Sequence, residues 1–217
     1  MQRNENLGRE RILTRIRSAL ASPTRLRNAG PSGQIFASIA DPLERFRKEC
    51  AANSTECLVT ADIAASTAAV SEILESIPLG EIFLQDAPLL RRAAAGWTTG
   101  RDIRWSSEGR PNEATKATIT LAESLVAATG SVFVSAGCGG RGASIVAPVH
   151  IVVATVTQLA ADLATAFEWL RARGTTTRNS MVSLITGPSR TGDIEKIIVL
   201  GAHGPQRLVV VLALHDE

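Results

Sequence analysis

From Ser183 to Arg207 the chain reads S-L-I-T-G-P-S-R-T-G-D-I-E-K-I-I-V-L-G-A-H-G-P-Q-R, which places a polar loop between two apolar runs. The apolar runs, Met181–Ile185 and Ile197–Leu200, are typical of buried strands. The polar loop between them is Thr186–Asp193. Since α/β proteins present site residues on loops anchored between buried strands, this loop is the first candidate for a functional site.

Strands and helices alternate along the chain before this segment. We expect strands at 57–60, 81–84, 102–105, 115–120, 131–135 and 151–155, and helices at 42–52, 63–77, 88–96, 121–128 and 159–173. Another apolar run, at 208–214, follows the quoted segment. The alternation predicts an α/β fold with a mostly parallel sheet flanked by helices.

The N-terminal region is expected to form a helical extension. Apolar residues recur at helical spacing over 9–21, and arginines occupy other positions of the same helix. Two interpretations stay open: the arginines bind an acidic partner or an anionic surface, or they stay in water while the apolar stripe packs on the domain. We expect residues 1–34 to form an amphipathic helix and linker, and residues 35–217 to form a single α/β domain.

Composition excludes several classes of protein. The chain has 217 residues, of which 45% are hydrophobic and 20% charged, which excludes a disordered protein. A net charge of +2 gives no electrostatic indication of nucleic-acid binding. No apolar run approaches the ~20 residues of a membrane span, and residues 1–20 lack the apolar core of a secretory signal, so we expect a cytoplasmic protein.

Cofactor motifs are weak in this sequence. Three cysteines without a C-x-x-C pair cannot supply four thiolates to an iron–sulfur cluster. Glycines at 137, 139 and 142 match G-x-G-x-x-G, but only 143–149 separates them from the next strand, so the crossover helix of a nicotinamide site is missing. No spacing of histidines and acidic residues indicates a metal site. We therefore expect no cofactor, and a glycine loop that either closes over a ligand or simply turns.

Cys138 in that loop is either a nucleophile or a small residue in a tight turn.

The residue types of the polar loop suit an anion. Free backbone N–H groups, hydroxyls and an arginine fork bind carboxylate or phosphate oxygens. The candidate ligand-binding residues are Gly187, Ser189, Arg190 and Thr191 of the polar loop, Gly139 and Arg141 of the glycine loop, and His150 at a strand start. The bland alternative is a capped turn with a solvated arginine.

Three titratable residues near the polar loop are candidates for catalysis. Asp193 or Glu195 would be a base or nucleophile, with His203 as the acid–base partner. Loops that follow parallel strands gather at one edge of the sheet. We therefore expect Thr186–Thr191 at the carboxyl ends of the strands, with Arg141 and His203 close by.

Five motifs of the chain resemble the LUD domain family, and within it lactate utilization protein C. They are R-x-x-I-L-x-R-I-R-x-A-L at 9–20, A-x-T-G-S-V-F-V-S-A-G at 127–137, P-V-H-I-V-V at 148–153, I-T-G-P-S-R-T-G-D-I-E at 185–195 and V-L-G-A-H-G-P at 199–205. The resemblance implies a fold similar to the ribose-phosphate isomerase and coenzyme A transferase superfamily. It also implies a role in oxidising L-lactate to pyruvate with iron–sulfur partner proteins.

Two other functions stay open beside this one. The first is a stand-alone enzyme that acts on a phosphorylated or coenzyme A-linked small molecule. The second is a sensor that binds a carboxylate without turning it over.

Overall fold

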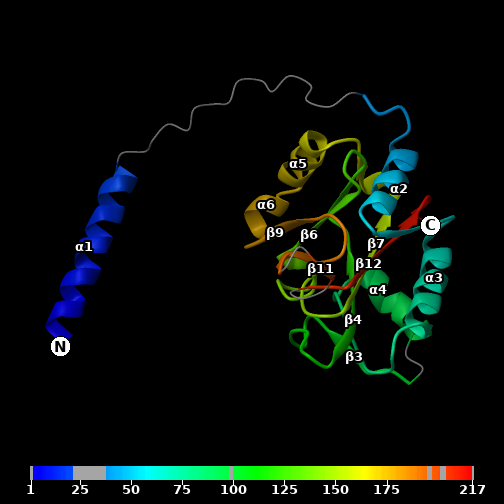
Figure 1. The fold of residues 1–217 in the computed structure, drawn as a ribbon, viewed down its shortest axis with the longest axis horizontal. Helices are drawn as coiled ribbons and strands as arrows, with labels where there is room; N and C mark the ends of the chain where they lie inside the picture. The colour runs from blue at the N-terminus through cyan, green and yellow to red at the C-terminus, as the bar shows by residue number, and fades with distance from the viewer. Residues whose placement is uncertain (1, 22–37, 98–99, 195–196, 201–203, 217) are drawn as a thin grey trace. The chain divides into compact units, whose positions relative to one another are not determined.

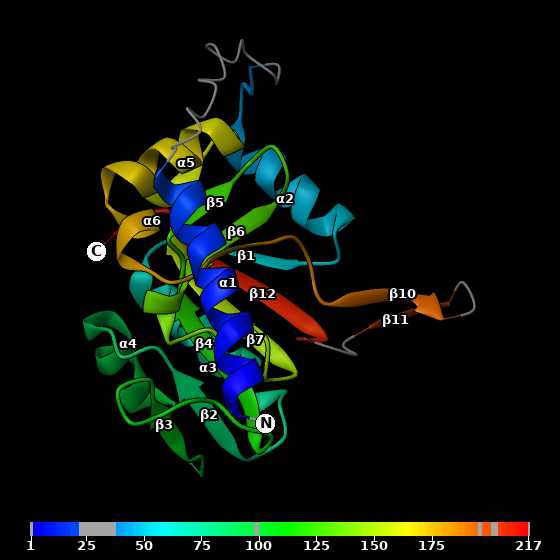
Figure 2. The same ribbon diagram turned by 90° about the vertical axis from the view of Figure 1, so that its left-hand side faces the viewer.

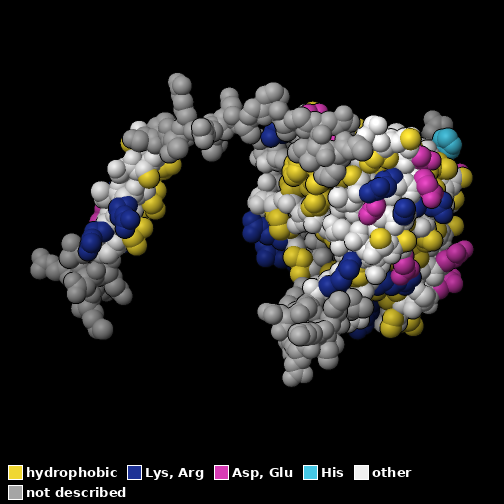
Figure 3. All heavy atoms as spheres, turned by 45° about the horizontal axis from the view of Figure 1, so that its top comes forward, with side chains coloured by type: hydrophobic (Ala, Val, Ile, Leu, Met, Phe, Trp, Pro, Cys, Tyr) yellow, Lys and Arg dark blue, Asp and Glu magenta, His cyan; other side chains and the backbone are white. Residues whose placement is uncertain are grey.

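The computed structural model describes residues 2–21, 38–97, 100–194, 197–200 and 204–216 of the chain. It separates into two compact units, Met1–Ala37 and Ser38–Glu217. The first unit contains the helix α1 (Gln2–Ala21), which begins earlier than the expected 9–21. Figure 3 shows hydrophobic side chains gathered along one side of this helix, and Ile12, Ile16 and Leu20 are exposed. None of the described helices is long and apolar enough to cross a membrane.

The second unit is built on a six-stranded parallel sheet (Figure 1). Its strands, in spatial order, are β1 (Glu56–Thr60), β12 (Arg207–Ala213), β7 (Val149–Thr155), β4 (Thr115–Leu121), β2 (Glu81–Leu84) and β3 (Ile103–Trp105). Each neighbouring pair is parallel. The expected α/β fold with a mostly parallel sheet is thus confirmed.

Both faces of the sheet are buried, which explains the continuous apolar runs of its central strands. Side chains alternate between faces along a strand, so Val209 and Val211 of β12 pack with one set of helices. These helices are α3 (Ile63–Glu75) and α4 (Pro88–Ala93). Val210 and Leu212 face the opposite way, toward α2 (Pro42–Ala52), which is capped by Asp41.

A second, smaller sheet covers the α2 side of the first. Its strands, in order, are β8 (Leu159–Ala160), β5 (Ser124–Val126), β6 (Ser131–Ser135) and β9 (Val182–Ile185). The helix α5 (Leu163–Ala172) packs on its outer face through Ala166 and Leu170, and α6 (Thr175–Arg178) follows. The short 3-10 helices are η1 (Ala94–Gly96), η2 (Ala136–Cys138) and η3 (Val156–Gln158).

Two expected helices are wrong in whole or in part. Residues 121–128 contain the strand β5, because Leu125 and Val126 point to two different buried clusters and only an extended backbone sends neighbours to opposite faces. The helix expected at 159–173 begins only at Leu163, after the N-cap Asp162. Leu159 pairs with Leu125 in the second sheet instead.

The expected arrangement around the polar loop is also wrong. β9 is a half-buried edge strand of the second sheet and not a buried strand of the parallel one. The strands β10 (Arg190–Ile194) and β11 (Ile197–Leu200) pair only with each other, so the second half of the polar loop belongs to one arm of a hairpin that projects from the domain (Figure 2). Pairing with the nearest strand in sequence closes the smallest loop, which costs the least chain entropy.

Candidate functional site

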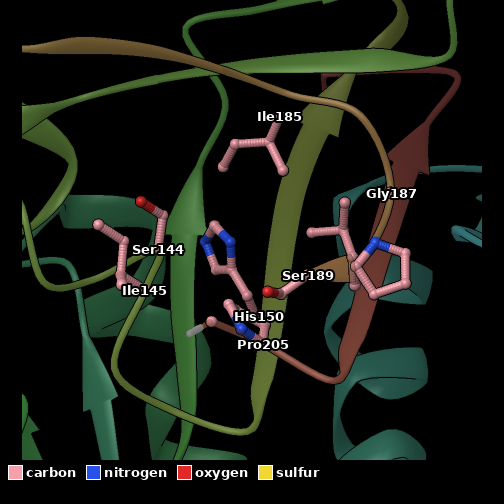
Figure 4. Close-up of a pocket in the computed structure, with 10 residues that line it drawn as sticks. Ser144, Ile145, His150, Ile185, Gly187, Ser189 and Pro205 are labelled. Atoms are coloured by element: carbon pink, nitrogen blue, oxygen red, sulfur yellow. The ribbon is translucent and has the colours of Figure 1, made fainter. Parts of the chain in front are cut away.

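A pocket of about 200 Å³ lies beside the loop that precedes β10 (Figure 4). We call it the His150 pocket. It is lined by Ser144, Ile145, His150, Ile185, Gly187, Pro188, Ser189, Gly204, Pro205 and Leu208. Small-molecule sites typically combine apolar walls with a few polar groups that fix orientation, and this lining has that character.

The His150 pocket lies at the amino ends of two neighbouring central strands. His150 is the second residue of β7, and Leu208 is the second residue of β12. The expectation that the polar loop lies at the carboxyl ends of the sheet strands is therefore wrong. The physical reason is a hydrogen bond between two loops. The Ser189 N–H donates to the Pro205 carbonyl at 2.8 Å, which holds the polar loop beside the turn that precedes β12.

His150 is the titratable residue of this pocket. Its side chain is fully buried, and its Nε2 lies 2.9 Å from the Thr120 hydroxyl on β4. Its Nδ1 has no hydrogen-bond partner among the described residues. Burial lowers the pKa of the imidazole to about 4, so the ring is neutral near pH 7. Figure 4 shows this ring in the pocket between the side chains of Ser144 and Ser189.

The loop at the pocket's other wall has a fixed backbone. Gly187 has φ +81°, and a Cβ added there would lie 2.4 Å from the Asn53 carbonyl oxygen. Asn53, just beyond the end of α2, also donates from Nδ2 to the Glu49 carbonyl at 2.9 Å and to the Thr129 carbonyl at 3.0 Å. Only glycine allows both this backbone conformation and this close approach. Gly187 thus allows the loop to pack closely against the C-terminal end of α2.

Three of the expected ligand-binding residues meet in the His150 pocket: His150, Gly187 and Ser189. Arg190 is exposed, and its Nη2 donates to the Asn53 carbonyl at 2.6 Å. Its side chain thus holds the same end of α2 from outside the pocket lining.

The two candidates from the glycine loop lie elsewhere. Arg141 is exposed and donates from Nη2 to the Ser180 carbonyl at 3.4 Å. Gly139 has φ +113°, and a Cβ added there would lie 3.1 Å from the Phe83 ring. Gly139 thus lies against the Phe83 ring, and neither residue is among those that line the His150 pocket.

The expected catalytic residues stay predictions. Asp193 lies in β10, as does the ligand-binding candidate Thr191, and the pairing of β10 with β11 shifts register between Thr191 and Ile194. Glu195 and His203 lie outside the described residues.

Cys138 of the glycine loop is a small buried residue in η2. Burial raises the pKa of its thiol to about 11, which keeps it protonated near neutral pH. The Glu123 carboxylate accepts hydrogen bonds from the Ser135 hydroxyl at 2.5 Å and from the Thr175 hydroxyl at 3.3 Å. The Cys138 thiol donates to the same carboxylate at 3.6 Å. Its burial and raised pKa support the interpretation of Cys138 as a small residue in a tight turn. Among the residues that the structure describes, no group of three or more histidine, cysteine and acidic side chains gathers to hold a metal ion.

Sequence reasoning missed Thr120, Ser144 and Asn53. Thr120 contacts His150 because β4 and β7 are neighbours, a relationship that follows from the strand order and from no local pattern. Asn53 follows the last residue of a clear amphipathic helix, so its position indicated a C-terminal cap. Its contact with a loop more than a hundred residues away had no signal in the sequence.

Comparisons with known proteins agree with the architecture. A family model described as the LUD domain matches residues 43–213. The crystal structure of a DUF162 family protein from Deinococcus radiodurans is similar to this chain, with a TM-score of 0.62 and 20% sequence identity over 82% of this chain and 99% of that chain. At that identity the likeness shows a shared fold. No curated protein matches the chain.

Proposed function

Since the chain belongs to the LUD domain family, we propose that it is a subunit of an L-lactate utilization system, which supports the oxidation of lactate to pyruvate together with iron–sulfur partner proteins. The LUD domain family is associated with lactate utilization. Under this proposal the chain binds the small carboxylate, and its partners carry the electrons.

The observation that best supports a ligand role is the His150 pocket. Its volume of about 200 Å³ suits a compact organic acid. The buried Nδ1 of His150 supplies one polar contact point, and Ser144 and Ser189 supply hydroxyls. Ile145, Ile185 and Leu208 form apolar walls against which a methyl group packs. L-Lactate carries one carboxylate, one hydroxyl and one methyl group, which these three kinds of contact match.

Electron balance supports the need for partners. Oxidation of lactate to pyruvate releases two electrons and two protons. The whole chain has three cysteines, fewer than the four thiolates of a usual iron–sulfur cluster. In the proposed assembly the electrons therefore pass to clusters held on other chains.

The test is growth of a clean deletion strain that has no backup lactate dehydrogenase. We expect failure to grow on L-lactate, normal growth on glucose, and rescue by the wild-type chain but not by His150→Phe, which fills the pocket with an apolar ring. Affinity purification of the wild-type chain is expected to recover iron–sulfur proteins. Normal growth of the deletion strain on L-lactate would contradict the proposal.

The two open alternatives predict other outcomes. Among the described residues that line the His150 pocket, none is arginine or lysine, so the lining lacks the cation that strengthens many phosphate sites. Turnover of a sugar phosphate or an acyl-coenzyme A by the purified chain would nevertheless favour the stand-alone enzyme. Thermal stabilisation of the purified chain by lactate, together with normal growth of the deletion strain on L-lactate, would favour the sensor.

A further inference from the structure

We propose that Thr120 fixes the proton of His150 on Nδ1, so that the His150 pocket presents a buried neutral N–H donor to a carboxylate or carbonyl oxygen of a small organic acid. The ligand class rests on the proposed function, because lactate and pyruvate are the first members to test. The arrangement of the proton rests only on the contacts around the ring.

The first step is the hydrogen-bond inventory of the ring. His150 and Thr120 are both buried, with exposed fractions of 0% and 1%. Their only mutual contact joins Nε2 to Oγ1 at 2.9 Å. A neutral imidazole carries one N–H and one acceptor nitrogen, so this contact has two possible directions.

The second step compares the two directions. If Nε2–H donates to Thr120, the hydroxyl proton of Thr120 has no acceptor among the described residues, and Nδ1 has no donor. If the Thr120 hydroxyl donates to Nε2, the ring proton lies on Nδ1, and the Nδ1–H is the single group left without a partner. Buried polar groups without partners are costly, so the second direction is favoured.

The third step identifies what satisfies the Nδ1–H. Figure 4 shows the ring in the pocket with the side chains of Ser144 and Ser189 on either side. The Ser189 backbone N–H is already bonded to Pro205, so the side-chain donors of the lining are the imidazole and the two serine hydroxyls. A set of neutral donors beside apolar walls suits an acceptor oxygen on a small organic acid. An ordered water is the competing occupant.

The control is supplied by the same strand. Thr118 is also fully buried on β4, but its hydroxyl donates to the Val149 carbonyl at 3.5 Å. Thr118→Val and Thr120→Val therefore remove a hydroxyl from two buried positions of the same strand, and only the second removes the hydrogen bond with His150. Thr120→Ser keeps the hydroxyl and serves as the conservative rescue.

The experiment is nitrogen NMR of the full chain labelled at histidine, at pH 7, with His150→Gln used to assign the His150 signals. We expect the Nδ1–H tautomer in the wild type, in Thr118→Val and in Thr120→Ser. We expect loss of that tautomer preference in Thr120→Val. An Nε2–H tautomer in the wild type would overturn the inference without any ligand being added.

Binding is then measured with pyruvate, L-lactate and acetate on the same proteins by calorimetry and by the shift of the His150 Nδ1 signal. We expect at least one probe to bind and to shift this signal, and roughly tenfold weaker binding to Thr120→Val, with Thr118→Val and Thr120→Ser unchanged. Equal binding to the wild type and to Thr120→Val would overturn the inference. The absence of binding of any probe would overturn it in favour of a water-filled pocket. Binding of acetate or pyruvate by a chain whose deletion leaves growth on lactate normal would instead reject the proposed function and keep the inference.

Discussion

The backbone carbonyl of Asn53 accepts a hydrogen bond from Nη2 of Arg190 at 2.6 Å, across 137 positions of sequence. The same carbonyl oxygen closes off the space next to the Cα of Gly187. Asn53 is itself held by its side-chain bonds to the Glu49 and Thr129 carbonyls. The loop that forms one wall of the His150 pocket therefore packs against the C-terminal end of α2. We call this the α2 contact of the loop.

Substitution of Gly187 tests the α2 contact of the loop. In Gly187→Ala the Cβ would lie 2.4 Å from the Asn53 carbonyl oxygen, and φ at this position is +81°. We expect a loss of about 1–3 kcal/mol in the free energy of unfolding from backbone strain. Urea unfolding measures it. Gly96→Ala is the control, because a Cβ there meets nothing within 4 Å and is expected to change stability by less than about 0.5 kcal/mol. Equal losses in the free energy of unfolding from the two substitutions would contradict the close packing of Gly187 against Asn53.

Removal of the Arg190 guanidinium tests the hydrogen bond itself. The side chain is exposed, so solvent replaces part of the lost contact. We expect Arg190→Ala to lower the free energy of unfolding by about 1 kcal/mol, a typical net value for one hydrogen bond. Differential scanning calorimetry of the variant checks this, with Arg141→Ala as a comparison whose hydrogen bond to Ser180 is longer, at 3.4 Å. A larger loss from Arg141→Ala than from Arg190→Ala would contradict the prediction.

Stability is expected to fall in mild acid because of His150. Burial lowers the pKa of this residue from 6.5 to about 4 in the folded protein. Below pH 6.5 the His150 side chain is protonated in the unfolded chain but stays neutral in the folded chain. The free energy of unfolding therefore decreases as the pH falls from 6.5 to about 4. The full difference corresponds to about 3 kcal/mol, of which about 2 kcal/mol is lost by pH 5.

Urea unfolding at pH 7 and pH 5 measures this loss. His150→Gln lacks the titrating ring and is expected to lose about 2 kcal/mol less than the wild type between the two pH values. The same loss in both proteins would show that other groups cause the acid sensitivity.

The three thiols are expected to differ in reactivity. A hydrogen bond from Cys50 lowers the pKa of the half-buried Cys57 thiol, whereas the hydrogen bond to Cys57, followed by burial, raises the pKa of Cys50. Burial raises the pKa of Cys138 to about 11. Since the thiolate is the reactive form, iodoacetamide is expected to label Cys57 first in the folded protein.

Peptide mass spectrometry of the labelled chain gives the order of reaction. In urea the three cysteines are expected to react at similar rates, which controls for local sequence. Cys50→Ala is expected to slow the labelling of Cys57 because it removes the hydrogen bond that lowers the pKa of Cys57. Preferential labelling of Cys138 in the folded protein would contradict this order and revive the nucleophile hypothesis for that residue.

The parallel sheet could be predicted from the sequence because its strands carry a strong local signal. The expected strand at 81–84 and the expected helix at 42–52 match β2 and α2 in their bounds. The strand β5 was missed because it has three residues, Ser124–Val126, and its neighbours Ala122 and Ala127 fit a helix as well. Such a short strand is defined by its partners β6 and β8, which no local pattern reveals.

Part of the candidate site was predictable for a similar reason. Gly187 and Ser189 were identified from their loop, and His150 from its place at a strand start. The edge of the sheet was predicted wrongly, because the loop is tied to the turn before β12 and not to the end of a parallel strand. The Thr120–His150 contact depends on which strands are neighbours, and strand order is a global property of the chain.

The position of β12 between β1 and β7 has a consequence for biosynthesis. A ribosome makes β1 early, yet its only partner in the sheet, from Glu56↔Val209 to Thr60↔Ala213, emerges about 150 residues later. During translation the edges of β1 and β7 that pair with β12 in the folded protein are thus still unpaired. An unpaired strand edge can pair with the wrong strand or with another chain. Closure of the sheet, and with it the wall of the His150 pocket at Leu208, is therefore expected only after β12 has left the exit tunnel.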